Sequence, residues 1–337
     1  MVRPTHVAWY ALGERQIPRQ NWHVSISRHS STARVRIGLV AAAALLGFAA
    51  CRATTHAPVG LAWTAQKDGL TVDLVATVHI GKPGTNAWPA LIASCWTNTK
   101  VLVVEADPTN PETVQEAFHR RAMLPPSEPS LETRLPPELV NRLQTHVRAV
   151  PSWQRLKPWA VANVVHLQSI LRWGYRPGQG LDVRLIERAR DEGRLVIELE
   201  GADEQLRIFD EAPWDVQVAY LQTTLDDLDS GHTQWEVERL IRAVDRGKLE
   251  VLEAALQELR DRGDPAGRYL LPRLFQQRHV VMAERIEAVA RRHGRCLVAV
   301  GAMHFAGPDS LLDALRARGF SVQRREVRSP TPCDRVQ

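Results

Sequence analysis

Four short apolar segments, each followed by a histidine or a glutamate, constrain the fold of this chain most strongly. Segments of this length that are rich in valine and leucine and bounded by glycine are typical of buried strands in an α/β sheet. Carboxylates are rarely buried unless they are paired or bind a metal ion, so these residues point to one shared site beyond the carboxyl ends of the strands. The segments cover residues 74–81, 100–107, 194–201 and 297–307, and the polar side chains are His79, Glu105, Glu200 and His304.

The segments between these strands predict mostly helices. Asp68-Gly69 is a strong signal for a hairpin turn between strands over residues 61–66 and 70–80. The sequence therefore predicts an α/β fold with strands at both ends of the chain around a large helical insertion. A histidine and a glutamate in each half suggest a central sheet from two related halves. Apolar residues at three- and four-residue spacing predict helices over residues 88–96, 136–149, 153–173, 181–191, 214–228, 234–245, 249–260 and 273–292.

The motifs around these residues resemble the TraB/GumN family, which includes the TIKI-type metal-dependent proteases. Ala-Thr-Val-His79 and Gly-Ala-Met-His304 are similar to the paired Gly-x-x-His signatures of that family, and Val-Val-Glu105 is similar to the glutamate of its first half. The resemblance covers roughly residues 58 to 328 and implies an EreA/ChaN-like fold. Further matches follow in the order of the family: Leu156-Lys157-Pro158-Trp159, Gly174-Tyr175 before Gly180-Leu181-Asp182, Glu200 with Gln205, and Met282-Ala283-Glu284-Arg285-Ile286.

Two positions depart from the family pattern. The first motif has Ala76 where glycine is usual, and a tight backbone accepts alanine there only if its φ angle is negative. The Arg-Asn pair that the family has before the methionine reads Arg278-His279 in this chain. If that asparagine helps to shape the site, the exchange alters the chemistry.

The four strand-end side chains suit a divalent metal ion. Neutral imidazole and carboxylate are good ligands for Mn²⁺, Co²⁺, Fe²⁺ or Zn²⁺, and an open coordination position would activate water. We expect one glutamate, Glu105 or Glu200, to serve as general base. Glu198 points to the same face of an ideal strand as Glu200, so either could be the site member, and the resemblance favours Glu200. The expected metal site consists of His79, Glu105, Glu200 and His304.

Several other residues have both a structural and a functional interpretation. Arg278 could stabilise an oxyanion, whereas a solvated helix face is the default for a lone arginine. Asp107 either joins the site or belongs to an Asp-Pro turn. Trp159 is expected to be a core anchor, and Tyr175 and Asp182 are candidate polar lining residues.

Together with the four strand-end residues, the resemblance to the TraB/GumN family implies a metal-dependent hydrolase that acts on peptides or proteins. The alternative is a non-catalytic envelope protein that binds a metal ion, haem or a polymer partner through the same cleft. No nucleic-acid partner is expected, although the formal net charge is +5. Six of the 43 Lys and Arg but only one of the 38 Asp and Glu lie in residues 1–51, so the rest of the chain has no basic surplus.

The N-terminal segment has the features of an export signal. Arg34 and Arg36 precede an apolar stretch over residues 37–50, which is shorter than the roughly 20 residues that span a bilayer. Phe48-Ala49-Ala50-Cys51 resembles a bacterial lipobox, so we expect lipidation of Cys51, with ordinary signal cleavage or an uncleaved anchor as alternatives. The protein would then be anchored in the cell envelope, and in a Gram-negative host on the periplasmic face of the outer membrane.

These predictions divide the chain into five parts. The parts are an extension over residues 1–33, a signal and lipobox over 34–51, a linker over 52–58, a folded domain over 59–328 and a disordered tail over 329–337. None of the four cysteines has a zinc-like spacing. After export, Cys95 and Cys296 could form a disulfide, and buried free thiols are the favoured interpretation.

Overall fold

The structure of this chain is a computed structural model that describes residues 58–84, 87–148, 150 and 152–326. The expected leader with Cys51, almost all of the linker and the C-terminal tail lie outside the described residues. In the part that is described, no helix is long and apolar enough to cross a lipid bilayer.

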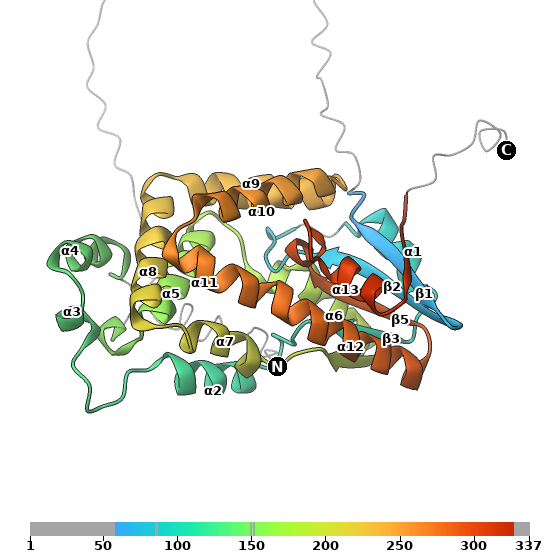
Figure 1. Cartoon of the computed structure of the whole chain (residues 1–337), viewed down its shortest axis with the longest axis horizontal. Helices are drawn as coiled ribbons and strands as arrows, with labels where there is room; N and C mark the ends of the chain where they lie inside the picture. Colours follow the sequence, from blue (N-terminus) through green and yellow to red (C-terminus); the bar gives the residue numbers. More distant parts are fainter. Residues whose placement is uncertain (1–57, 85–86, 149, 151, 327–337) are drawn as a thin grey trace, which may run out of the picture. The chain divides into compact units, whose positions relative to one another are not determined.

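Six strands form one mixed sheet in the order β4-β3-β5-β2-β1-β6 (Figure 1). The strands β4, β3, β5 and β2 run parallel to one another, whereas β1 is antiparallel to both β2 and β6. The predicted α/β class is therefore confirmed, and the four apolar segments are β2 to β5. The strands are β1 (Ala62–Lys67), β2 (Leu70–Thr77), β3 (Val101–Val104), β4 (Leu195–Glu198), β5 (Cys296–Gly301) and β6 (Ser321–Arg324).

The predicted hairpin joins β1 to β2. Lys67 pairs with Leu70 across the turn, and the two turn residues Asp68 and Gly69 have φ angles of 48° and 80°. Two positive φ angles are what a two-residue hairpin turn that matches the strand twist requires. Asp-Gly therefore sets the register in which β2 enters the sheet.

Most helices fall into two insertions, one between β3 and β4 and one between β4 and β5, whereas α1 lies between β2 and β3 and α13 lies between β5 and β6 (Figure 1). The predicted helix over residues 153–173 begins at Pro158, because Lys157 has the extended conformation that a following proline imposes. The predicted helix over residues 273–292 begins at Gln276, since the backbone breaks at Phe275. The sequence patterns missed the short or polar helices α2, α3, α7 and α11. The helices are α1 (Ala90–Trp96), α2 (Pro111–Ala122), α3 (Leu131–Arg134), α4 (Pro137–His146), α5 (Pro158–Arg172), α6 (Leu181–Asp191), α7 (Ala202–Asp210), α8 (Trp214–Asp229), α9 (His232–Asp245), α10 (Leu249–Arg262), α11 (Pro265–Leu274), α12 (Gln276–His293) and α13 (Leu311–Ala317).

Helices cover both faces of the sheet. Leu74 and Val298 face a core with α9, α10, α12 and α13, and their strand neighbours Val75 and Leu297 face a second core with α1 and α6. This alternation is the period of two that a strand imposes on its side chains. With both faces covered, only the ends of the parallel strands remain open for a site.

A third core lies within the helical insertions, where α2 to α5, α7 and α8 pack together. Trp159 is fully buried there, and its ring stacks on Phe209 with 5.9 Å between centroids. The interpretation of Trp159 as a core anchor is confirmed. Figure 1 shows this helical region beside the sheet.

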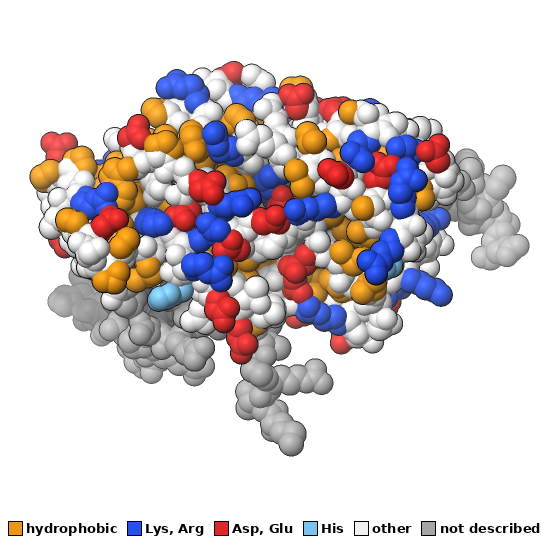
Figure 2. Space-filling model, turned by 60° about the horizontal axis from the view of Figure 1, so that its bottom comes forward, with side chains coloured by type: hydrophobic (Ala, Val, Ile, Leu, Met, Phe, Trp, Pro, Cys, Tyr) orange, Lys and Arg blue, Asp and Glu red, His pale blue; other side chains and the backbone are white. Residues whose placement is uncertain are grey.

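The two cysteines of the described domain are free thiols. Cys95 and Cys296 are both completely buried, and burial raises their pKa values to about 11 and about 12. The favoured interpretation of buried free thiols is confirmed, and the disulfide alternative is wrong for this conformation. Lys and Arg side chains are interspersed with Asp and Glu over the face of the molecule shown in Figure 2.

Candidate functional site

The strand-end residues of the sequence pattern lie at the carboxyl edge of four neighbouring strands. Glu105 follows β3 directly, and Glu200 lies two residues beyond β4. His79 lies two residues beyond β2, and His304 belongs to the 3₁₀ turn η3 (Ala302–Phe305) that follows β5. Because β4, β3, β5 and β2 are parallel neighbours, their ends bring these four residues to one edge.

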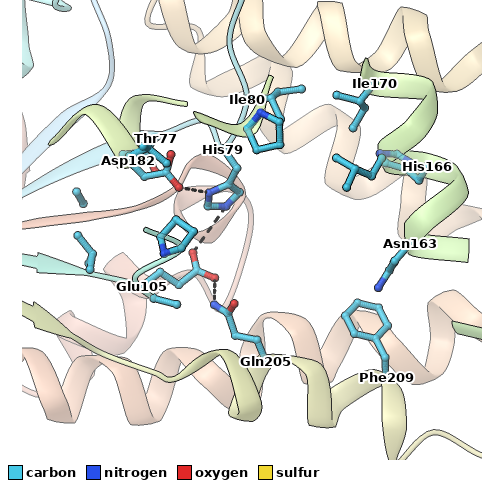
Figure 3. Close-up of a pocket in the computed structure, with 17 residues that line it drawn as sticks. Thr77, His79, Ile80, Glu105, Asn163, His166, Ile170, Asp182, Gln205 and Phe209 are labelled. Carbon is cyan, nitrogen blue, oxygen red and sulfur yellow. Dashed lines mark hydrogen bonds and ion pairs between the residues drawn. The ribbon is translucent and has the colours of Figure 1, made fainter. Parts of the chain in front are cut away.

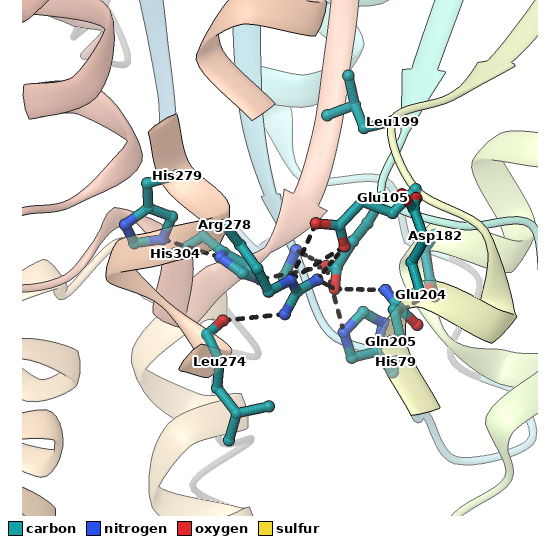
Figure 4. Close-up of polar contacts among 12 residues, drawn as sticks. His79, Glu105, Asp182, Leu199, Glu204, Gln205, Leu274, Arg278, His279 and His304 are labelled. Carbon is teal, nitrogen blue, oxygen red and sulfur yellow. Dashed lines mark hydrogen bonds and ion pairs between the residues drawn. The ribbon is translucent and has the colours of Figure 1, made fainter. Parts of the chain in front are cut away.

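Glu105 is at the centre of this cluster. Its Oε1 accepts hydrogen bonds from Gln205 Nε2 at 2.8 Å and from Arg278 Nη2 at 2.5 Å (Figure 4). Its Oε2 accepts a bond from the Gly301 backbone N–H at 3.2 Å. The two carboxylate oxygens therefore have different partners, and the guanidinium of Arg278 lies at Oε1.

Two imidazoles face the other oxygen of Glu105. His304 Nε2 lies 3.4 Å and His79 Nε2 lies 4.0 Å from Oε2. Burial opposes ionisation of Glu105, but the adjacent charges of His304, Arg278 and His79 hold the pKa of this carboxyl well below its usual range. Glu105 is therefore an anion in this site.

Each imidazole is oriented by a partner on its far nitrogen. His79 Nδ1 lies 2.7 Å from Asp182 Oδ2, and His304 Nδ1 lies 2.9 Å from His279 Nε2. His279 Nδ1 in turn lies 2.6 Å from the Asp309 carbonyl oxygen, which can only accept. His279 therefore donates from Nδ1 and accepts at Nε2 when it is neutral, and His304 donates from Nδ1.

The charge states of these imidazoles follow from the same contacts. Burial, with the neighbouring His304, lowers the pKa of His279 to about 4, so His279 is neutral and can accept from His304. Desolvation of the His79 ring is outweighed by the charge and hydrogen bond of Asp182, with the charge of Glu105, which raise the pKa of His79 to about 9. The His79 side chain is 59% exposed and that of His304 only 5%, so solvent reaches the cluster from the His79 side.

Arg278 connects Glu105 to Glu200. Its Nη2 lies 2.6 Å from Glu200 Oε2, and its Nε lies 3.1 and 3.0 Å from the two Glu200 oxygens. The side chain is held from behind by the Leu274 carbonyl oxygen, which accepts from Nη1 at 2.9 Å. Arg278 is thus an inward-facing part of the cluster, and the default of a solvated arginine is wrong.

Glu198 and Asp107 lie apart from this ion cluster. Glu198 Oε1 accepts a hydrogen bond from the Asp107 backbone N–H at 2.6 Å. Asp107 Oδ1 accepts from the backbone and hydroxyl of Thr109 at 2.9 and 2.6 Å, and its Oδ2 pairs with Arg190. Asp107 therefore forms the Asp-Pro turn that its sequence suggested.

Small residues set how closely the strand ends approach. A Cβ atom on Gly301 would lie 3.0 Å from His79 Nε2 and 3.4 Å from Glu105 Oε2, so only glycine leaves these donors unobstructed. Ala76 lies within β2 and is not among the described residues with positive φ, which meets the condition expected for alanine at this position. Gly180 has the same role against His79, whose carbonyl would lie 2.6 Å from an added Cβ. That close approach places Asp182, at the start of α6, beside the imidazole.

Sequence reasoning underrated three contributors. Asp182 was one of two candidate lining residues, and Gln205 was noticed only as part of a motif. His279 was noticed only as a departure from a family pattern, although it orients His304. Tyr175, the other candidate lining residue, is buried beneath Lys82, whose Nζ lies 4.7 Å from the centre of its ring.

The donor set at Glu105 resembles a metal site in the types of its ligands. Two imidazole Nε2 atoms, each oriented by a hydrogen bond on Nδ1, converge on one carboxylate oxygen, which is how proteins orient metal-binding histidines. A tetrahedral ion with bonds of about 2.1 Å holds its ligand atoms about 3.4 Å apart. The distance from His304 Nε2 to Glu105 Oε2 is 3.4 Å and matches this value, whereas the distance from His79 Nε2 to the same oxygen is longer, at 4.0 Å. Among the described residues, no group of three or more His, Cys, Asp or Glu is placed so that it could hold a metal ion in this conformation. The donors therefore fit in type and orientation, and His79 would have to move closer.

Two cavities meet at this cluster. One has a volume of about 320 Å³ and lies between the strand ends and helices α5 and α7 (Figure 3). The other, of about 290 Å³, lies between the strand ends and helices α9 to α12. Thr77, His79 and Glu105 line both cavities.

Comparisons with known proteins agree with the resemblance seen in the sequence. The "Uncharacterized protein YbaP" of Escherichia coli K12 is 29% identical over 250 residues, which cover 72% of this chain and 87% of that protein. Metalloprotease TIKI1 of Danio rerio is 24% identical over 321 residues, which cover 80% of this chain and 63% of that protein. No solved structure matches the chain. Residues 61–324 match the model of the TraB/PrgY/gumN family, and the chain therefore belongs to this family.

Proposed function

We propose that this protein is a metal-dependent hydrolase that cleaves peptide bonds. The observation that supports this proposal most is the convergence of His79 Nε2 and His304 Nε2 on Glu105 Oε2, with each ring oriented from behind. In this proposal these three residues hold a divalent ion such as Mn²⁺, Co²⁺, Fe²⁺ or Zn²⁺. The relative named Metalloprotease TIKI1 also supports a metal-dependent hydrolase.

A bound divalent ion would supply Lewis-acid chemistry to the hydrolysis. The protein contributes the arrangement around it. Asp182 and His279 fix the direction of the two imidazoles, and Gln205 and Arg278 hold Oε1 of Glu105 so that Oε2 faces the imidazoles. Glu200, the fourth predicted member, fixes Arg278, whose guanidinium can stabilise negative charge that develops on a substrate carbonyl oxygen.

Metal binding is the first test of this proposal. Mn²⁺, Co²⁺ or Zn²⁺ should raise the melting temperature of the chelator-treated protein, because a ligand that binds only the folded state stabilises it. His79→Ala and His304→Ala should lower metal affinity by at least about tenfold. His293→Ala, an exposed histidine at the end of α12, is the matched control. Equal metal binding by wild type and the double site variant, with both folded, would refute the site.

Turnover is the second test. Cleavage of a peptide library should require the metal, should stop on chelation, and should be lost in Glu105→Gln with the fold intact. A non-catalytic envelope protein that binds a metal ion, haem or a polymer through the same cleft is the alternative. It is favoured by the pairing of both Glu200 oxygens with Arg278, which leaves Glu200 unavailable as a general base in this conformation. Partner binding that is unchanged by Glu105→Gln and Glu200→Gln would support the alternative.

Two finer proposals concern the rest of the chain. We propose that the six-stranded sheet and its helical insertions form an EreA/ChaN-like fold of two related halves, which an experimental structure would test. We also propose that Cys51 is lipidated and anchors the protein in the cell envelope. A bacterium that expresses the protein should incorporate labelled fatty acid into it, and labelling that persists in Cys51→Ser would exclude this site.

A further inference from the structure

The candidate site lies between two cavities that are formed by different helices. Only Thr77, His79 and Glu105 line both cavities. A peptide chain that lies across the strand ends at Glu105 would therefore have one cavity on each side of the peptide atoms that are within reach of the cluster. The site is exposed at His79, where the two cavities meet.

The first cavity has both apolar and polar groups on the wall that lies across from the site. Leu167 and Ile170 of α5 and Phe209 of α7 contribute apolar and aromatic surface. Asn163 and His166, on the same side of α5, face the strand ends across the space in Figure 3. Burial lowers the pKa of His166, so its ring is neutral at pH 7.

Asn163 leaves a donor for a ligand on this wall. Its Oδ1 accepts a hydrogen bond from the Tyr220 hydroxyl at 2.8 Å, which assigns the amide nitrogen to the other side. No hydrogen bond of that nitrogen to another described residue is observed. A hydroxyl or carbonyl oxygen in this cavity could therefore be hydrogen-bonded by Asn163.

The second cavity lacks such polar groups on the wall away from the cluster. That wall consists of Leu240 and Val244 of α9, Leu252 of α10, and Leu274 and Phe275. Its polar lining residues, among them Arg278 and His304, belong to the cluster itself. A polar group deep in this cavity would lose its hydration without gaining a partner.

We propose that the two cavities are subsites for the side chains on either side of the bond that is cleaved, so that the substrate is an extended peptide with a large apolar residue at both positions. This inference rests on the proposed function for the identity of the reaction. The cavity with Asn163 accepts tyrosine as well as phenylalanine, whereas the cavity with Leu240 rejects tyrosine. Volumes of about 320 and 290 Å³ leave room for one aromatic side chain each.

Peptide binding to the metal-free protein tests this proposal without turnover. Labelled capped tetrapeptides with Phe, Tyr or Ala at the two central positions are titrated and followed by fluorescence anisotropy. Exchange of either Phe for Ala should weaken binding by about tenfold or more, because each exchange empties an apolar subsite. Exchange of Phe for Tyr should be neutral at one position and should cost about tenfold at the other.

Two blocking variants assign the positions to the cavities. Leu167→Trp should remove the preference for a large residue at the position that tolerates Tyr, and Leu240→Trp should remove it at the position that rejects Tyr. Val280→Trp, on an exposed part of α12 outside both cavities, should change neither preference. The proposal would be overturned if no peptide binds, if all peptides bind with equal affinity, or if both blocking variants remove the preference at the same peptide position.

Failure of this proposal can be distinguished from failure of the proposed function. Metal-dependent cleavage of peptides together with position-independent binding would refute the two subsites alone. Binding that depends on both positions, with no cleavage in the presence of any metal tested, would refute the hydrolase and retain the two cavities as a peptide-binding site.

Discussion

The substitution Gly301→Ala separates the proposed metal site from the stability of the fold. Gly301 has φ −53° and ψ 137°, angles that any residue adopts, so alanine introduces no backbone strain. In the metal-free protein, alanine should even stabilise the fold by up to about 1 kcal/mol, because it reduces the conformational entropy of the unfolded chain. The new methyl group, however, would lie 3.0 Å from His79 Nε2 and 3.4 Å from Glu105 Oε2.

The expected loss of metal affinity follows from the narrow range within which metal-ligand distances are held. The 3.0 Å contact forces His79 away by a few tenths of an ångström, which exceeds the roughly 0.2 Å within which metal-ligand distances are held. His79 is already the more distant imidazole and has to approach, so we expect at least about a tenfold loss of affinity, or about 1.4 kcal/mol. At saturating metal this loss lowers the metal-induced rise in melting temperature by about 3 to 5 °C.

The assay compares melting temperatures with chelator and with saturating Mn²⁺, Co²⁺ or Zn²⁺. Gly301→Ala should melt at or slightly above the wild-type temperature in chelator and show a smaller metal-induced rise. The matched control is Ala76→Gly at the equivalent motif position, which should cost about 0.5 to 1 kcal/mol with and without metal. An undiminished metal-induced rise in Gly301→Ala would refute the placement of the ion between these donors.

Three further substitutions test neighbouring parts of the structure. His279→Leu removes the acceptor that orients the imidazole of His304, so calorimetric titration should show about a 10- to 100-fold loss of metal affinity. The control is His279→Asn, whose side chain can still accept a hydrogen bond. An equal loss of affinity in this variant would contradict the orienting role. Arg278→Gln leaves the buried carboxylates of Glu105 and Glu200 without their shared cation. Urea denaturation of the metal-free protein should therefore show that the free energy of unfolding falls by about 3 to 5 kcal/mol. A change below about 1 kcal/mol would contradict the ion cluster. Hydrogen bonds from Lys67 and then from two arginines lower the pKa of Glu287 from 4.5 to about 2. Because its folded pKa lies below the unfolded value, this stabilisation is present above about pH 4.5 and is lost toward pH 2, so Glu287→Gln should flatten the melting temperature profile over that range; an unchanged slope would contradict it.

The sheet was predictable because its signals are local. Apolar runs of four to eight residues and an Asp-Gly turn determine strands and a hairpin within one short window, and the helix over Leu181–Asp191 was predicted with the bounds that the structure has. The break at Phe275 was missed because the apolar spacing continues through it on both sides. The start of α5 could have been read from Pro158, which disfavours helix in the residue before it.

The site was only partly predictable, because its decisive contacts join residues far apart in sequence. The pairs Glu105 with Arg278 and His79 with Asp182 are separated by 173 and 103 residues. No local pattern distinguishes Arg278 from a solvated arginine on the same helix. What the sequence does carry is the repeated placement of His or Glu after an apolar strand, which is informative only once parallel strands bring their ends together.

The ion cluster at the sheet edge is better explained by function than by stability. Replacing a buried ion pair by apolar residues of similar volume is often neutral or stabilising, so Arg278 and Glu200 are not needed to hold a sheet that is already covered on both faces. A cluster that served stability would also satisfy its own polar atoms. Thr77 Oγ1 and Asp182 Oδ1 are buried beside His79 and have no hydrogen-bond partner among the described residues. Buried polar atoms that are left unpaired beside His79 are consistent with the proposed site for an ion and its substrate.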